Sequence, residues 1–284
     1  MRSITPSTLF FALATAGLAG SALALVGPGF PNLSIGADNN NADNPFIQPG
    51  PDPALSGGGR DQSLKFGDVL FGTNGNNILQ GRLGTDVLVG GSNDDVLIGG
   101  TEHFFPENRD RAFGGEGNDL FLWSPGDGSD FFDGGPGLDA VALGLMGEIN
   151  DQGELVFQVT PDQQAGDVYF DPATGLPSMD VTNSPGFCEV IDAYDGREAA
   201  ANLEALGLDN LTRFFIRGVA DAFEAGQQTE DNGLRVTLHL VDVEYVICAT
   251  REGGQIEVFD LTGPIPTKIR VGQVPIAAVA AIVQ

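Results

Sequence analysis

The chain has few basic residues, with 13 Lys and Arg against 39 Asp and Glu, which gives a formal net charge of −26. Nucleic acids and anionic membrane surfaces bind proteins through clusters of Lys and Arg, so this imbalance argues against both as partners. Histidine is also scarce, with two residues, and neither the HExxH pattern of metalloproteases nor the GxSxG pattern of serine hydrolases occurs. The sequence therefore lacks the motifs of the common secreted hydrolases.

Long apolar runs are rare, and the clearest one lies at the N-terminus. Leu9–Leu18 is apolar and follows a short basic start, and Ala22-Leu23-Ala24 fits the small-x-small rule for signal cleavage. Residues 1–24 are therefore predicted to be a secretory signal, with an uncleaved membrane anchor as the alternative. We expect a secreted or cell-surface protein, with a periplasmic location left open. Residues 25–62 are rich in Pro, Gly and Asn, which is typical of a linker.

A nine-residue repeat with a glycine-rich turn occupies the region from Gly72 to Ala142. Its clearest units read GTNGNNILQ, GRLGTDVLV, GGSNDDVLI, GGEGNDLFL and GGPGLDAVA. A unit this short can form only one turn and one short strand, so the units must stack into a solenoid to bury apolar surface. An acidic or amide residue recurs at one fixed position of the turn, at Asp68, Asn77, Asp86, Asp95, Asp110, Asp119, Asp130 and Asp139.

The composition of these turns fits calcium. Ca²⁺ takes six to eight oxygen ligands from carboxylates and backbone carbonyls in flexible geometry. Glycine adopts positive φ at little cost, which lets a turn direct its carbonyls toward an ion. We therefore expect several Ca²⁺ ions, held by the eight residues above together with turn glycines at Gly72, Gly81, Gly90, Gly99, Gly114 and Gly134.

An apolar column accompanies the turns, two residues after each acidic or amide position. This spacing places the column on the inner face of successive strands, as the core of the solenoid. Its members are Leu70, Leu79, Leu88, Leu97, Ala112, Phe121, Phe132 and Val141.

The repeat resembles the RTX, or hemolysin-type, calcium-binding nonapeptide family over residues 63–142. The resemblance implies a right-handed parallel β-roll, with two turns and two strands per coil and calcium held between turns two units apart on one edge. Asp86 would then lie between the Asp68 and Asp110 turns, and Asp95 between those of Asn77 and Asp119.

Three features depart from the family pattern. Asn77 has no charge, Arg82 replaces a second glycine, and an enlarged turn before Asp110 interrupts the nine-residue spacing. The N-terminal signal also differs from the export route usual for this family, in which the address lies at the carboxyl terminus.

Residues 146–284 have a different residue pattern and are predicted to form a separate α+β domain after the roll at 63–145. Short strands are expected at 153–160, 167–171 and 234–240, followed by a hairpin over 243–262. Helices are expected at 198–206, stopped by Gly207, and from Asp209 through Phe223. The uncharged tail at 274–284 is predicted to be a last strand, with a residual export address as the alternative.

The chain has two cysteines, Cys188 and Cys248, both in the C-terminal part. In an exported protein such a pair is predicted to form a disulfide, and two buried free thiols are the alternative.

Two classes of function remain. The first is a non-catalytic calcium-binding structural, surface or adhesive module, whose macromolecular partners would be cell-surface or extracellular-matrix components. The second is a secreted hydrolase with a carboxylate-based site in the C-terminal part. The missing catalytic motifs favour the first, and no catalytic residue stands out among the many acids.

Overall fold

The computed structural model describes residues 32–35, 68–82, 85–100, 109–149, 153–157, 168–192, 203, 205–218 and 235–284. The predicted signal segment, most of the predicted linker and the enlarged turn at 101–108 lie outside the described residues. Four residues of the segment expected to be a linker, Asn32–Ile35, form a strand (β1).

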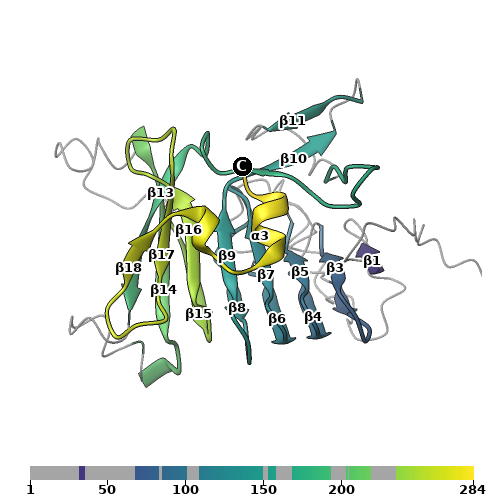
Figure 1. The fold of residues 1–284 in the computed structure, drawn as a ribbon, viewed down its shortest axis with the longest axis horizontal. Coiled ribbons are helices and arrows are strands. Elements are labelled where there is room, and N and C mark those ends of the chain that lie inside the picture. Colours follow the sequence, from purple (N-terminus) through teal and green to yellow (C-terminus); the bar gives the residue numbers. More distant parts are fainter. Residues whose placement is uncertain are drawn as a thin grey trace, which may run out of the picture.

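The repeats form two stacked parallel sheets, and successive units alternate between them (Figure 1). The units that begin at Asp68, Asp86, Asp110 and Asp130 supply the strands of one sheet, β2 (Val69–Phe71), β4 (Val87–Ser92), β6 (Arg111–Glu116) and β8 (Phe131–Asp133). The units that begin at Asn77, Asp95, Asp119 and Asp139 supply the other, β3 (Asn77–Gln80), β5 (Val96–Ile98), β7 (Leu120–Trp123) and β9 (Ala140–Leu143). Each coil thus contains two turns and two strands.

The predicted apolar column is confirmed as the layer between the sheets. Seven of its eight members are fully buried, and Leu70 packs against them from the first strand. The rings of Phe121 and Phe132 stack with centroids 5.4 Å apart across this layer. In-register parallel pairing, such as Leu88 opposite Ala112 and Leu97 opposite Phe121, places each column residue over the next.

The C-terminal part extends the same two sheets. β15 (Arg235–Val241) pairs in parallel with β8, and β16 (Tyr245–Ala249) pairs in parallel with β9. Antiparallel strands then complete each sheet, with β13 (Gly186–Asp192) and β14 (Asn210–Ile216) on one, and β17 (Ile256–Asp260) and β18 (Thr267–Ile269) on the other. The predicted hairpin is confirmed as β16–β17, whereas the predicted α+β character of this part is not confirmed.

Two predicted elements of this part are wrong. The helix expected from Asp209 is strand β14, because its alternate residues Asn210, Thr212 and Phe214 face inward while β13 and β15 pair on either side. The tail expected to be a strand instead forms the helix α3 (Ala277–Ile282), preceded by the 3₁₀ turn η3 (Val271–Gln273).

The tail helix packs on the outer face of the β3–β9 sheet. Ala278, Val279 and Ile282 form one side of α3 and join the apolar cluster on that face. The spacing of three and four residues matches a helical face, and Ala-rich sequence favours a helix. Within the described residues, no helix has the length and apolar character needed to cross a membrane.

A small third sheet stands beside the roll. β10 (Leu145–Ile149) pairs antiparallel with β11 (Leu155–Phe157) and with β12 (Met179–Asp180). The strand expected at 167–171 is present only as isolated bridges at Val168 and Phe170. Of the helix expected at 198–206, the described residues Leu203, Ala205 and Leu206 are helical, and Gly207 follows them with φ +71°.

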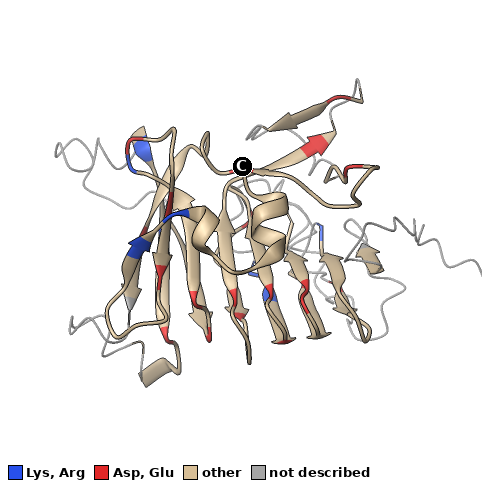
Figure 2. Ribbon diagram, viewed as in Figure 1, with Lys and Arg blue, Asp and Glu red and all other residues tan. Residues whose placement is uncertain are grey.

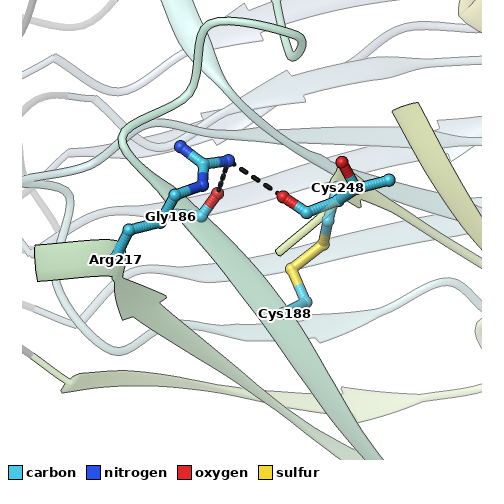
Figure 3. Close-up of a disulfide and its surroundings, with 5 residues drawn as sticks. Gly186, Cys188, Arg217 and Cys248 are labelled. Carbon is cyan, nitrogen blue, oxygen red and sulfur yellow. Dashed lines mark hydrogen bonds between the residues drawn. A yellow bond between two sulfur atoms is a disulfide. The ribbon is translucent and has the colours of Figure 1, made fainter. Parts of the chain in front are cut away.

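A disulfide joins the two sheets at their C-terminal end (Figure 3). Cys188 on β13 and Cys248 on β16 are both buried, and their Cα atoms lie 6.0 Å apart. Next to it, the guanidinium of Arg217 donates hydrogen bonds to the carbonyls of Gly186 at 2.7 Å and Thr250 at 3.0 Å. These contacts tie the ends of strands from opposite sheets together.

Candidate calcium-binding edges

One edge of the roll carries a ladder of carboxylates. The Oδ1 atom of Asp86 accepts a hydrogen bond from the backbone N–H of Asp68 at 2.5 Å. In the same way Asp110 accepts from Asp86 at 2.6 Å, and Asp130 accepts from Asp110 at 2.8 Å. Each carboxylate is therefore held in place by the preceding coil, in the order that the family resemblance implied.

The opposite edge carries a second ladder. Asp95 accepts from the backbone N–H of Asn77 at 2.7 Å, Asp119 from Asp95 at 2.8 Å, and Asp139 from Asp119 at 2.7 Å. Figure 2 shows acidic residues recurring along successive strands of the roll, with few basic residues near them. The eight sequence-predicted acidic and amide residues thus lie in two rows, one on each edge.

The second oxygen of these carboxylates has no hydrogen-bond partner among the described residues. This holds for the fully buried Oδ2 atoms of Asp86, Asp95, Asp110, Asp119, Asp130 and Asp139. A buried carboxylate oxygen without a partner is unfavourable, because nothing replaces the water it has lost. The orphaned oxygens therefore mark places where a cation or a proton is needed.

Four of the six orphaned oxygens lie next to the bare Cα of a turn glycine, those of Asp86, Asp95, Asp110 and Asp119. We call the space where a Cβ would stand on that glycine the glycine recess. A Cβ on Gly81 would lie 2.3 Å from Oδ2 of Asp86 and 2.6 Å from the carbonyl oxygen of Gly99. The recesses of Gly90 and Gly114 have the same composition, an Asp Oδ2 at 2.4 and 2.3 Å and a glycine carbonyl oxygen at 2.6 Å in both. A carboxylate and a carbonyl oxygen thus converge on one small space.

The turn conformation also follows from the sequence. The second position of the repeat turn has positive φ at Gly91 and Gly115, and Arg82 adopts φ +74° at the equivalent position. Asn93 likewise has φ +75° in a glycine position. Arg82 therefore keeps the turn geometry although it lacks the freedom of glycine.

Burial shifts the acidity of these groups. It raises the pKa of Asp95 to about 6, of Asp119 to about 7 and of Asp139 to about 8. On the other edge, burial is the main cause that raises the pKa of Asp86, Asp110 and Asp130 well above its usual range, and the negative charge of another aspartate of the same ladder adds to it. Without a cation, the stacked charges oppose one another and favour protonation.

This donor set fits calcium. Hard carboxylate and carbonyl oxygens are what Ca²⁺ takes, and the glycine recesses bring them together without a side chain in the way. The residues that would hold the ions are the ladder aspartates and the turn carbonyls beside them. Bound calcium would supply the positive charge that the buried oxygens lack.

The turn of Asn77 differs from the others. Its side-chain Nδ2 donates hydrogen bonds to the carbonyls of Thr73 and Gly75 and to Oδ1 of Asp95. The amide of Asn77 therefore donates to oxygen atoms that a cation would otherwise neutralise. A Cβ on Gly72 would lie 2.8 Å from this Nδ2, so the amide partly occupies the Gly72 recess.

Residues outside the repeat complete the second ladder. Oε2 of Glu244 accepts the backbone N–H of Asp139 at 2.7 Å, and thus acts as the next rung. The carbonyl oxygen of Asp242 lies 2.3 Å from the Cβ position of Gly134, where earlier coils have a glycine carbonyl. Asp242 has φ +47°, as a repeat turn requires. The spacing could not reveal these residues, because 105 positions separate Asp139 from Glu244.

Asp127, in the turn between β7 and β8, is a third residue at these edges that lies outside the repeat pattern, after Glu244 and Asp242. It forms a buried group with Asp110 and Asp130 whose carboxylate oxygens all lie within 4.8 Å of one another. Its position between Gly126 and Gly128 is the one sequence signal that could have identified it.

The comparison with protein families agrees with this geometry. Residues 66–101 match the RTX calcium-binding nonapeptide repeat, in four copies. RTX repeats bind calcium, so calcium binding by this region is supported by sequence and geometry alike. Neither a curated protein nor a solved structure matches the chain.

Proposed function

Because residues 66–101 are RTX calcium-binding nonapeptide repeats, we propose that the protein is an exported, non-catalytic structural module whose roll folds around calcium. The observation that carries the proposal is the set of six buried Oδ2 atoms without hydrogen-bond partners, in two rows along the edges of the roll. In the glycine recesses, backbone carbonyl oxygens lie close to these Oδ2 atoms. Metal neutralisation accounts for both features together.

Calcium would act as the link between coils. Each ladder carboxylate already joins two coils by a hydrogen bond from its Oδ1 atom, as in Asp119 to Asp139 at 2.7 Å. An ion on Oδ2 would add a second link of opposite charge and remove the repulsion along the row. The strands are too short to hold the coils alone, since β5 has three residues and β7 has four. Folding of the roll would therefore depend on the metal.

The proposed location follows from the calcium requirement. Extracellular calcium modules work at about 10⁻⁴ to 10⁻³ M, a range in which sites stay empty in the cytosol and fill after release. The N-terminal segment 1–24 would direct export, which places folding outside the cell or in the periplasm. The chain would then fold where it acts.

The C-terminal part would serve as the cap of the roll. β15 and β16 form one more coil on top of β8 and β9, and Glu244 and Asp242 complete the last turn. The disulfide between Cys188 and Cys248 ties this cap across the core. A capped, acidic roll of this kind would act at the surface or in the medium, with cell-surface or matrix components as partners.

Calorimetric calcium titration of single-site variants tests the proposal. Asp95→Ala and Asp119→Ala each remove one ladder carboxylate from the more regular edge, so both should weaken calcium binding by tenfold or more. The control is Glu252→Ala, at an exposed position in the hairpin turn outside the repeats, which should leave binding unchanged. Full-length protein that takes up no calcium at millimolar concentrations would contradict the proposal.

A further inference from the structure

The turn between β7 and β8 differs in chemistry from the other turns of the roll. It is longer than a repeat turn and places Asp127 beside Asp110 and Asp130 of the first ladder. All three side chains are fully buried. Three carboxylates therefore share one enclosed space, whereas the recesses of Gly81, Gly90 and Gly114 each contain one carboxylate and one carbonyl.

The recess of Gly99 shows what Asp127 replaces. A Cβ on Gly99 would lie 2.3 Å from Oδ2 of Asp110, as the ladder geometry requires. At Gly81, Gly90 and Gly114 the second oxygen in the recess is a glycine carbonyl 2.6 Å away. At Gly99 the next oxygen is instead Oδ1 of Asp127, at 3.2 Å. A charged carboxylate oxygen has taken the place of a neutral carbonyl oxygen.

We propose that Asp110, Asp127 and Asp130 form a separate tricarboxylate calcium site, and that this site binds calcium more tightly than the regular repeat sites. This inference rests on the proposed function, and extends it by ranking the sites and by adding a ligand from outside the repeat pattern. The turn between β7 and β8, which is longer than a repeat turn, thereby supplies the strongest ligand set of the roll.

A second observation points to a ligand at this place. The Oδ2 atoms of Asp110 and Asp130 are buried and accept no hydrogen bond from any described residue. The turn itself is fixed, because Nε1 of Trp123 donates to the carbonyl of Gly128 at 3.1 Å and the N–H of Asp127 donates to Ser124 at 3.0 Å. The carboxylates are thus held close together by the fold.

Charge determines which ion fits. Calcium affinity in oxygen sites rises with the number of charged ligands and with the rigidity of the site. Three carboxylates favour a divalent cation strongly and a trivalent lanthanide such as Tb³⁺ even more. Calcium is preferred over magnesium, since magnesium demands near-ideal octahedral geometry and gives up its water reluctantly.

The chain contains its own reporter for this site. Trp123 is the single tryptophan, and its indole contacts the turn that carries Asp127. Energy transfer from an excited indole sensitises the emission of Tb³⁺ bound nearby. The regular ladder on the opposite edge lies at the other end of β7, about 13 Å of strand away from this turn.

The test is Trp-sensitised Tb³⁺ luminescence of the full-length protein, followed by displacement with Ca²⁺. The first equivalent of Tb³⁺ should produce most of the sensitised emission, and Ca²⁺ should displace this ion last. Asp127→Asn keeps the side-chain shape and removes the charge, and should weaken binding at this site by tenfold or more. Asp94→Asn is the matched control in a repeat turn of the opposite edge, where Asp94 accepts the N–H of Asn118 at 2.8 Å.

The outcomes separate this inference from the function on which it rests. Wild-type protein that binds no calcium overturns both. Calcium binding that is weakened equally by Asp127→Asn and Asp94→Asn, or by neither, overturns the tricarboxylate site alone. The wild-type titration needs no variant. A first equivalent of Tb³⁺ that binds without sensitised emission also overturns the tricarboxylate site.

Discussion

Filling a single glycine recess should remove one calcium ion from the roll. Gly114→Ala adds a methyl group that would lie 2.3 Å from Oδ2 of Asp119 and 2.6 Å from the carbonyl oxygen of Gly134. Both distances are shorter than real Cβ contacts, and one partner is backbone, which cannot move away easily. Gly114 does not have positive φ, so the backbone itself accepts alanine. The effect is therefore steric and local to the recess.

The magnitude has two parts. Overpacking a rigid position costs about 1–3 kcal/mol. An ion present at 100 times its Kd stabilises the folded state by about 2.7 kcal/mol, and this contribution is lost with the site. At saturating calcium, Gly114→Ala should therefore lower the free energy of unfolding by roughly 4–6 kcal/mol.

Calcium titration by calorimetry and thermal unfolding in calcium measure the two parts. We expect one bound ion fewer than in the wild type, together with a lower Tm. Gly272→Ala is the control, because no heavy atom lies within 4 Å of its added Cβ and its φ is ordinary. A Gly114→Ala protein with the full number of ions and unchanged affinity would refute the assignment of the recess as a binding position.

Three further changes test other parts of the structure. Phe121→Ala leaves a cavity in the fully buried inner column, and should cost about 3–5 kcal/mol in chemical unfolding, whereas a loss below 1 kcal/mol would contradict the packing. Replacing Cys188 and Cys248 together by Ala removes a disulfide that spans 60 positions, and should lower the free energy of unfolding by about 4 kcal/mol in the same assay. An unchanged unfolding midpoint would argue against a stabilising bridge. Burial raises the pKa of Glu148 to about 7 from 4.5. Its charge therefore destabilises the fold increasingly as pH rises through this interval, so Glu148→Gln should raise stability at pH 8 by up to about 3 kcal/mol and have little effect near pH 4.5. Equal effects at both pH values would contradict that sign.

The roll could be predicted from the sequence because its period carries the information. Each unit repeats the same turn, so Leu88 and Leu97 could be placed inside, and Asp86 and Asp95 on opposite edges, without any long-range contact being known. The alternation between the sheets follows from two units per coil. Even Arg82, which breaks the glycine pattern, adopts the turn conformation of its neighbours.

The C-terminal part could not be predicted in the same way, because its strands are selected by partners distant in sequence. Leu211 and Phe215 have a spacing that suits a helix, yet the available edge of β15 makes this segment a strand. Glu244 became a rung of the ladder only through parallel pairing of β16 with β9. The apolar composition of the tail suits a strand and a helix alike, and the tail is a helix because that form packs on the outer face of the sheet.

Circular dichroism of the full-length protein, recorded with chelator and with millimolar calcium, tests directly whether the roll requires calcium to fold. We expect weak β-structure in chelator and a cooperative gain of β-structure as calcium is added, since the buried carboxylates of both ladders need the ions to stack. An identical spectrum and an identical Tm in the two conditions would contradict it, and would make the roll a scaffold that folds without metal.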